Sequence, residues 1–336
     1  MNIKQFFLMT ILGVSLLVAS NAQAQKSFFN PEVPDIVQYE VTPDVKYGEG
    51  KVNANGKVAM KDLTMDVYYP KAESSEPRPA VILTYGGSFH RGNPRSPYTG
   101  FGGQTTSMSQ YAMRYAAEGF VVFTINYRVA PDNPIVDEYS GYTEDDIDVS
   151  IFTNPAAVAQ TNVIRQQMGL EPLTDENAEP VLKATVLAAA EDLRTAIHHV
   201  KAENKTYNIN PDKIALGGFS AGAVTSINVA YGMQEDVSAV FINSGFVAGL
   251  KVANKIAASD SNPPIMMFMS DNDYPVVSMF TQPLIQIFKA NNVEYHFNWV
   301  PGFGHFYPGG AVTLSDEGDK APLIERTLGF LKEKLQ

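Results

Sequence analysis

A serine flanked by small residues constrains the fold of this chain more than any other feature. Gly218, Ser220 and Gly222 form the pattern G-x-S-x-G, and the apolar stretch 214–216 runs directly into it. A sharp strand-to-helix turn needs neighbours with little or no Cβ, because its backbone is strained and packs closely on itself. The pentapeptide alone also fits a glycine-rich turn of another α/β protein, so the flanking segments carry the prediction. We expect a buried strand, a turn that presents the Ser220 hydroxyl, and a helix over 221–231.

Apolar runs of strand length alternate with amphipathic segments along the rest of the chain. The predicted strands cover 63–69, 80–85, 120–126, 214–216, 237–242, 265–269 and 293–300, and the predicted helices 107–118, 186–200, 221–231, 283–290 and 322–335. Continuous apolar strands are expected where helices cover both faces of a sheet. Regular alternation of strand and helix implies a doubly wound, mostly parallel sheet. We therefore expect an α/β fold, with one domain over 53–336.

The N-terminal segment has the pattern of a secretory signal. A lysine precedes an apolar run over 6–19, and the small-residue motif Ala22-Gln23-Ala24 follows it. The run is shorter than the roughly 20 residues that span a bilayer, which disfavours the alternative of a transmembrane anchor. The chain has no cysteine, so it has neither a lipoprotein anchor nor a disulfide. We predict a signal peptide over 1–24, no membrane span after its cleavage, and a periplasmic or secreted protein.

Charge is distributed unevenly along the chain. The net charge of −11 argues against binding to nucleic acid, which requires a basic face. Residues 25–52 are rich in proline and acidic side chains, and we expect them to form an extended lead-in to the domain. Residues 132–180 hold eleven acidic residues against Arg165 alone. We expect this segment to be an insertion that acts as a cap over the carboxyl edge of the sheet. Its cluster 144–148 lacks the glycine and spacing of a calcium loop, so we interpret it as a solvated acidic surface rather than a metal site.

The glycines after strand 80–85 suggest a site for negative charge. Gly86 and Gly87 directly follow this strand and precede Ser88. Such a pair allows backbone N–H groups to turn toward a ligand, as an oxyanion hole requires.

A serine hydroxyl needs a base to accept its proton, and the base needs an acid to orient it. The chain has five histidines. His90 lies beside the glycine pair, His296 lies within a predicted strand, and His198 and His199 lie on a packing helix. His305 lies in a loop beyond the end of a strand, next to a glycine, and we predict that it is the base.

The acid should leave the end of a strand between the serine and the histidine. Asp271 and Asp273 both follow strand 265–269. We favour Asp273 as the orienting carboxylate and expect Asp271 to cap the turn. The order serine, aspartate, histidine is the one found in α/β-hydrolases.

Three motifs in this order give the chain a specific resemblance. Tyr85-Gly86-Gly87-Ser88 resembles His-Gly-Gly-Gly, the stretch 126–131 (Asn-Tyr-Arg-Val-Ala-Pro) resembles Asp-Tyr-Arg-Leu-Ala-Pro, and 218–222 resembles the nucleophile elbow of the α/β-hydrolase superfamily. From Leu63 to its end the chain is similar to carboxylesterases of the hormone-sensitive-lipase-like and acetylxylan-esterase-like groups. The resemblance implies that the backbone N–H groups of Gly87, Ser88 and Ala221 bind the oxyanion, with Gly86 permitting the turn.

The chain also departs from the family pattern. Tyr85, Ser88 and Asn126 stand where the family often has histidine, glycine and aspartate. The Cβ of Ser88 restricts the loop. Phe219 replaces an acidic residue of hormone-sensitive-lipase-like elbows, which favours the secreted carbohydrate-esterase-like group. We expect substrate selection to depend on the insertion and on aromatic residues such as Phe89, Tyr98 and Phe101.

These observations predict a secreted serine carboxylesterase that works through an acyl-enzyme and needs no metal or cofactor. Its expected substrates are small-molecule or carbohydrate esters, such as acetyl or feruloyl esters. The alternatives are a lipase, a peptidase, or a binding protein that kept the fold and lost catalysis. The acidic insertion would oppose docking on anionic lipid, and no second large domain is evident to filter peptides.

Overall fold

The computed structural model describes residues 38–336 except 101, 137–140 and 260. The predicted signal peptide, 1–24, and Phe101 lie outside the described residues. Among the described helices, none is long and apolar enough to cross a membrane.

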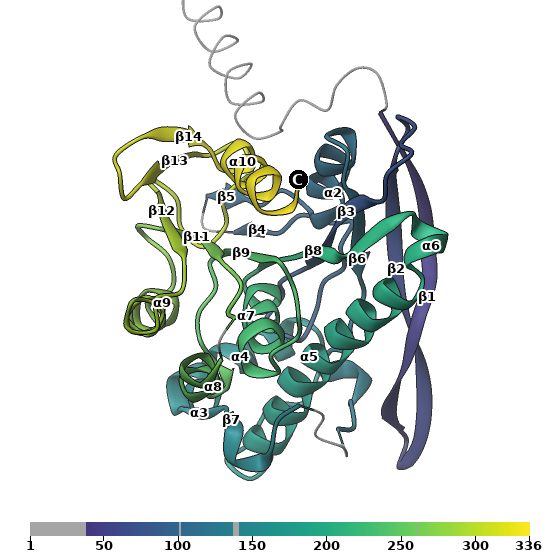
Figure 1. Ribbon diagram of the computed structural model, residues 1–336. Helices are drawn as coiled ribbons and strands as arrows, with labels where there is room; N and C mark the ends of the chain where they lie inside the picture. Colours follow the sequence, from purple (N-terminus) through teal and green to yellow (C-terminus); the bar gives the residue numbers. More distant parts are fainter. Residues whose placement is uncertain (1–37, 101, 137–140, 260) are drawn as a thin grey trace, which may run out of the picture.

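One ten-stranded sheet runs through the molecule (Figure 1). Its central strands, from β6 to β12 in the order below, are all parallel, and antiparallel strands flank them at both edges. In spatial order the strands are β1 (Tyr39–Ala54), β2 (Lys57–Pro70), β6 (Val121–Ile125), β3 (Arg78–Thr84), β8 (Ile209–Phe219), β9 (Ala239–Asn243), β11 (Ile265–Ser270), β12 (Tyr295–Val300), β13 (Val312–Ser315) and β14 (Lys320–Pro322). The predicted mostly parallel α/β sheet is therefore confirmed.

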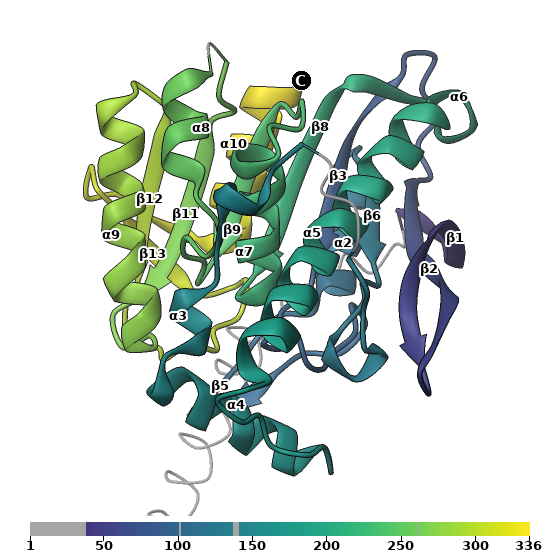
Figure 2. The same cartoon turned by 90° about the horizontal axis from the view of Figure 1, so that it is seen from below.

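Helices cover both faces of the sheet (Figures 1 and 2). Figure 1 shows α2 and α10 on one face and α5, α7, α8 and α9 on the other. Their bounds are α2 (Met108–Ala117), α5 (Ala178–Ala202), α7 (Ala221–Ile227), α8 (Val252–Ala258), α9 (Pro275–Ala290) and α10 (Leu323–Leu335), and a short α6 (Asn204–Tyr207) follows α5. Every residue of β6, β9 and β11 is buried, as expected for strands with helices on both sides.

The acidic insertion forms a cap on the face that carries α5 and α7. It begins at the end of η1 (Ala130–Asp132) and contains η2 (Glu144–Asp146), β7 (Ile147–Asp148), α3 (Ser150–Thr153) and α4 (Pro155–Gln167). Figure 2 shows α3 beside the lower end of α9, and α4 at the lower edge of the view near the lower end of α5. Two acids of the cluster 144–148 pair with lysines, Glu144 with Lys183 and Asp146 with Lys255. In the described part of the chain there is no group of three or more His, Cys, Asp or Glu residues with the arrangement of a metal site.

Several elements differ from the sequence-based expectation. From Tyr39 onward the expected lead-in is strand β1, which pairs antiparallel with β2 at the edge of the sheet. Most of its side chains are exposed, and Pro43, Gly48 and Gly50 break its apolar alternation, so its pairing with β2 defines the strand. Helix α9 begins at Pro275 and includes Pro283, which we expected to start it. The antiparallel pair β13 and β14 was not predicted; both strands are short.

Candidate active site

The predicted turn around Ser220 is a tight connection between β8 and α7. Ser220 has φ 53° and ψ −117°, a strained backbone conformation for a residue with a side chain. A Cβ on Gly218 would lie 2.3 Å from the carbonyl carbon of Gly222, and one on Gly222 would lie 2.0 Å from the Thr84 oxygen. The Ser220 N–H donates to the Asn243 carbonyl at 2.9 Å. The small residues of the motif are therefore required by close backbone approach.

Ser220, His305 and Asp273 meet at the carboxyl ends of three strands. His305 Nε2 lies 2.9 Å from Ser220 Oγ, and His305 Nδ1 lies 2.6 Å from Asp273 Oδ1. The carboxylate accepts from Nδ1–H, which leaves the Nε2 lone pair facing the serine hydroxyl. Asp273 and His305 are both buried. The structure thus assembles the geometry in which a histidine accepts a serine proton.

The alternative residues lie in other interactions. Asp271 accepts from the Gly302 N–H at 2.9 Å and so holds the loop that leads to His305. His296 is half-exposed on β12 and contacts Glu294 at 2.9 Å. Geometry therefore favours Asp273 over Asp271 as the acid, and His305 over His296 as the base.

Further groups hold the acid and the base in place. Asp273 accepts from the Tyr274 N–H at 2.7 Å and, through its second oxygen, from Ser244 Oγ at 2.5 Å. Ser244 Oγ also lies 2.9 Å from the Tyr307 hydroxyl. The Tyr274 ring stacks on the His305 imidazole, with the centroids 4.4 Å apart. Ser244 follows β9, 29 residues from Asp273 in sequence, so no local pattern indicated this contact.

Phe219 joins an aromatic cluster beside the base. Its ring centroid lies 5.1 Å from that of His305. The Phe219 ring also contacts the rings of Tyr98, Phe306 and Tyr307. This position, where related elbows carry an acid, is therefore part of the apolar wall behind the imidazole.

The glycines after β3 form a close-packed loop against the elbow. A Cβ on Gly86 would lie 2.8 Å from the Phe219 ring and 3.1 Å from Ser220 Cβ. Gly87 has φ +108°, and a Cβ there would lie 1.8 Å from the Arg91 carbonyl oxygen. Gly86 therefore packs beside the nucleophile, while Gly87 turns the loop back on itself.

Ser88 and Ala221, two of the predicted oxyanion donors, line the same cavity as Ser220. Ala221 is the first residue of α7, where helix N–H groups have no intrahelical acceptor. Ser88 takes φ 55°, and Phe89 takes φ 60°. Ser88 thus adopts the left-handed conformation that glycine favours, at an energetic cost that its surroundings must offset.

Two tyrosine hydroxyls hold the carbonyls of this loop. Tyr98 donates to the Gly86 oxygen at 2.8 Å, and Tyr127 lies 3.0 Å from the Tyr85 oxygen and 3.2 Å from the Gly86 oxygen. The rings of Tyr85 and Tyr127 stack with their centroids 4.4 Å apart. Tyr85 therefore supports the loop by stacking where related proteins have histidine. Tyr127 belongs to a recognised motif, but its contact with the loop was not predicted.

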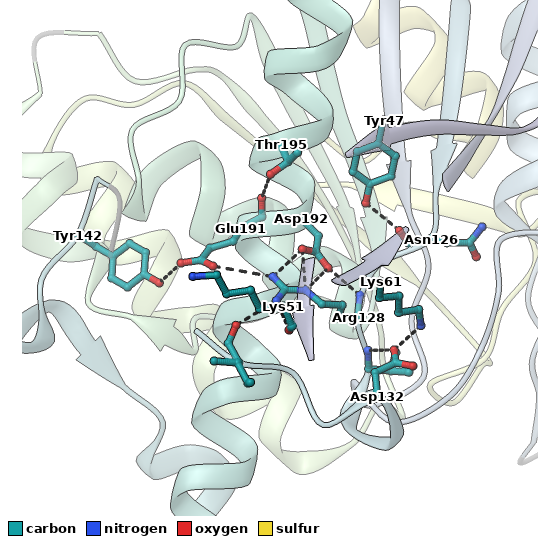
Figure 3. A network of polar contacts seen from close by, with 12 residues as sticks. Tyr47, Lys51, Lys61, Asn126, Arg128, Asp132, Tyr142, Glu191, Asp192 and Thr195 are labelled. Carbon is teal, nitrogen blue, oxygen red and sulfur yellow. Dashed lines mark hydrogen bonds and ion pairs between the residues drawn. The ribbon is translucent and has the colours of Figure 1, made fainter. Parts of the chain in front are cut away.

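A buried ion pair anchors the segment that carries Tyr127. Arg128 donates to the Asp192 carboxylate through its backbone N–H and its Nη2, both at 2.7 Å, and through Nε at 3.0 Å. Figure 3 shows this pair together with the Asn126 carbonyl, which accepts from the Tyr47 hydroxyl at 2.7 Å. Burial alone would lower the pKa of Arg128, but the Asp192 carboxylate outweighs it, so the pKa is raised. The pair ties the end of β6 to the middle of α5.

A cavity of about 530 Å³ opens onto Ser220 and His305. Its walls come from the cap, α5, α7 and the start of α9. Its apolar lining includes Ile151, Phe152, Leu182, Val186, Val224 and Phe246. Among the described residues that line it, none is Asp, Glu, Lys or Arg. The cavity is therefore suited to a neutral, apolar group.

Residues 173–313 match the model of a family described as phospholipase/carboxylesterase. The matched segment covers less than half of the chain. The matched segment contains Ser220, Asp273 and His305.

Solved structures of the same fold include two bacterial esterases. Esterase B from Lactobacillus rhamnosis is 16% identical, with a TM-score of 0.53 over 98% of this chain and 94% of that one. Thermogutta terrifontis esterase 2 with bound propionate is also 16% identical, with a TM-score of 0.52 over 90% of this chain and 94% of that one. At this identity the likeness establishes the α/β-hydrolase fold. No curated protein matches the chain significantly.

Proposed function

We propose that this α/β-hydrolase is a serine carboxylesterase for neutral esters that carry a sizeable apolar or aromatic group. The observation that carries the proposal is the contact of Ser220, His305 and Asp273 at the mouth of an uncharged apolar cavity. A cavity of about 530 Å³ lies within the range of roughly 300–1,000 Å³ that accommodates a drug-sized ligand. An acetyl group fills little of it, so the cavity favours bulkier groups, such as the feruloyl group, over acetyl.

The chemistry follows from the hydrogen bonds at the site. Ser220 Oγ attacks the ester carbonyl carbon while its proton passes to His305 Nε2. Asp273 stabilises the resulting imidazolium, and the N–H groups of Ser88 and Ala221 are the proposed donors to the oxyanion, with Gly87 beside them. His305 then gives its proton to the leaving alcohol, and an acyl-enzyme forms on Ser220. Water hydrolyses the acyl-enzyme by the same steps, with His305 again as base.

A neighbour of the same fold supports a nucleophilic serine. Thermogutta terrifontis esterase 2, 15% identical with a TM-score of 0.50 over 90% of this chain and 94% of that one, has been solved phosphorylated by paraoxon. We expect paraoxon to phosphorylate Ser220 in this chain.

The test is a series of p-nitrophenyl esters, from acetate through butyrate to octanoate and benzoate, with methyl ferulate added. We expect hydrolysis to depend on Ser220 and kcat/KM to rise from acetate to the bulkier esters. Ser220→Ala should lose about six orders of magnitude in kcat, as for other serine hydrolases. A Ser220→Ala variant with undiminished activity would disprove the serine mechanism. A steady fall in kcat/KM from acetate onward would instead restore acetyl esters as the preferred class.

We also propose export of the protein, on the sequence pattern of residues 1–24. Expression of the full chain in a bacterium should give a periplasmic or secreted product whose first residue is near Gln25. A full-length product retained in the cytoplasm would refute this proposal.

A further inference from the structure

Three successive residues after Ser88 each contact the cap. The Phe89 ring packs edge-on against the Phe152 ring of α3, with the centroids 5.8 Å apart. The next two residues contact α4 through polar atoms: His90 Nε2 lies 3.4 Å from Arg165 Nη1, and Arg91 Nη1 donates to Gln167 Oε1 at 3.0 Å. The loop that presents Ser88 to the substrate is therefore fastened to the cap as well as to the core.

His90 connects the cap to Ser88 itself. The imidazole is fully buried, and its Nδ1 lies 2.8 Å from the Ser88 carbonyl oxygen. A carbonyl accepts only, so Nδ1 carries the proton and Nε2 presents a lone pair to the Arg165 guanidinium. Burial lowers the pKa of His90, and the charges of Arg165 and Arg91 act in the same direction, against the contact with Ser88. The ring is therefore held in the neutral form that makes both contacts.

The loop requires such restraints because its backbone is strained. Ser88 and Phe89 both have positive φ, and residues in such conformations persist when the surrounding structure fixes them. Tyr98 and Tyr127 hold the Gly86 carbonyl from the core side. His90 holds the Ser88 carbonyl, and its second nitrogen depends on the cap.

The same cap also touches the substrate cavity. Phe152 and Ile164 line it together with Ser88 and Phe89. A group bound in this cavity thus contacts both sides of the junction between cap and loop.

We propose that the cap is a positioning part of the oxyanion hole, acting from Arg165 through His90 to the Ser88 carbonyl. A substrate group that fills the cavity packs against the cap and the loop at once. This packing stabilises the conformation of the loop in which its N–H groups bind the oxyanion. The remote part of the ester then raises kcat as well as lowering KM, because its binding energy is used to orient the reacting centre. This inference rests on the proposed ester hydrolysis.

The experiment compares kcat and KM for p-nitrophenyl acetate and butyrate in two variants and their combination. Arg165→Met keeps the aliphatic stem and removes the guanidinium. His90→Asn keeps a side-chain donor near the Nδ1 position and removes Nε2. Gln166→Ala, at an exposed neighbour on α4, is the matched control. Circular dichroism and thermal unfolding establish that each variant is folded.

We expect each single variant to lose about ten-fold in kcat for the butyrate, with KM changed less, because a misplaced oxyanion donor mainly affects the transition state. The double variant should lose no more than the worse single variant, since both break one chain of contacts. The kcat advantage of butyrate over acetate should shrink in Arg165→Met, Arg165→Lys should recover part of it, and Gln166→Ala should behave as the wild type.

Wild-type kcat in Arg165→Met, a change in KM alone, or fully additive losses would each overturn the inference. His90 is buried, so His90→Asn could fail to fold. In that case the Met and Lys variants of Arg165, which is partly exposed, test the inference. Failure of the proposed function is a separate result: wild-type protein would then show no hydrolysis that depends on Ser220. An active, Ser220-dependent wild type with an unaffected Arg165→Met refutes the role of the cap alone.

Discussion

The two halves of the active site are held by different parts of the molecule. In the acid–base half, Asp273 and His305 follow core strands and lie 2.6 Å apart, and Asp273 also accepts from Ser244 Oγ at 2.5 Å. In the oxyanion half, a strained loop is held by tyrosines from other segments and by three contacts with the cap, of which the two polar ones measure 3.0 and 3.4 Å. The first half is fixed by the folding of the sheet. The second half is fixed by side chains far away in sequence, so it is the half that substrate binding can adjust.

The largest expected effect breaks the acid–base half. Asp273→Asn leaves the shape of the site but removes the negative charge, so it favours the wrong tautomer of His305 and leaves its imidazolium unstabilised. We expect a loss of about 10⁴-fold in kcat, as in other serine hydrolases. Asp271→Asn is the matched control, because Asp271 holds the Gly302 N–H instead of the base. A larger loss of kcat from Asp271→Asn than from Asp273→Asn would show that Asp271, and not Asp273, orients the base.

The acid–base half was also the more predictable half. Each of its residues follows a strand with a clear apolar signal, and parallel strands bring their carboxyl ends to one edge. The position of Asp273 and His305 could therefore be inferred from chain order. The choice between Asp271 and Asp273 could not be inferred in this way. Both follow the same strand, and what separates them is the direction in which each side chain points.

For the oxyanion half, the position of the loop was predictable, but the side chains that hold the loop were not. Gly86 and Gly87 indicated the loop. The stretch 126–131 resembled a family motif, but the resemblance did not indicate the contact of Tyr127 with the loop. The links from Tyr98 to Gly86 and from Arg165 to His90 depend on how separate loops pack, which periodicity does not encode. Strand β1 was missed for a local reason: Pro43 interrupts its short apolar alternation, Gly48 and Gly50 follow it, and its pairing with β2 is irregular at both places.

A second prediction tests the foundation of the oxyanion half. Asp192→Ala leaves the buried Arg128 guanidinium with only the more distant Glu191 carboxylate, 3.9 Å from Nη2, and removing one partner of a buried pair typically costs about 3–5 kcal/mol. We expect a loss of this size in the free energy of unfolding, measured by urea denaturation. Lys46→Met, which removes exposed pairs with Glu49 and Asp62, should change stability little. Equal losses of unfolding free energy in the two variants would mean that the buried pair stabilises the fold no more than an exposed pair does.

A third prediction returns to the acid–base half at smaller scale. Ser244→Ala removes the hydroxyl that donates to Asp273 at 2.5 Å. Hydrogen bonds to charged groups contribute about 1.5–3 kcal/mol, so we expect kcat to fall by roughly ten-fold to a hundred-fold with KM nearly unchanged. Ser244→Thr keeps the hydroxyl and should retain more activity. Wild-type kcat in Ser244→Ala would show that the His305 and Tyr274 contacts suffice to hold the carboxylate.

The smallest effect is expected from the core-side support of the oxyanion loop. Tyr127→Phe keeps the ring stacked on Tyr85 and removes the hydroxyl near the Tyr85 and Gly86 carbonyls. Neutral hydrogen bonds contribute about 0.5–1.5 kcal/mol each, and Tyr98 still holds Gly86, so kcat should fall by roughly three-fold to ten-fold. Combining Tyr127→Phe with Arg165→Met removes a restraint from each side of the loop. If the core and the cap act independently, the two losses multiply. A combined loss larger than the product would show that either support can hold the loop when the other is absent, and the contrast between the two halves would then be one of redundancy as well as of strength.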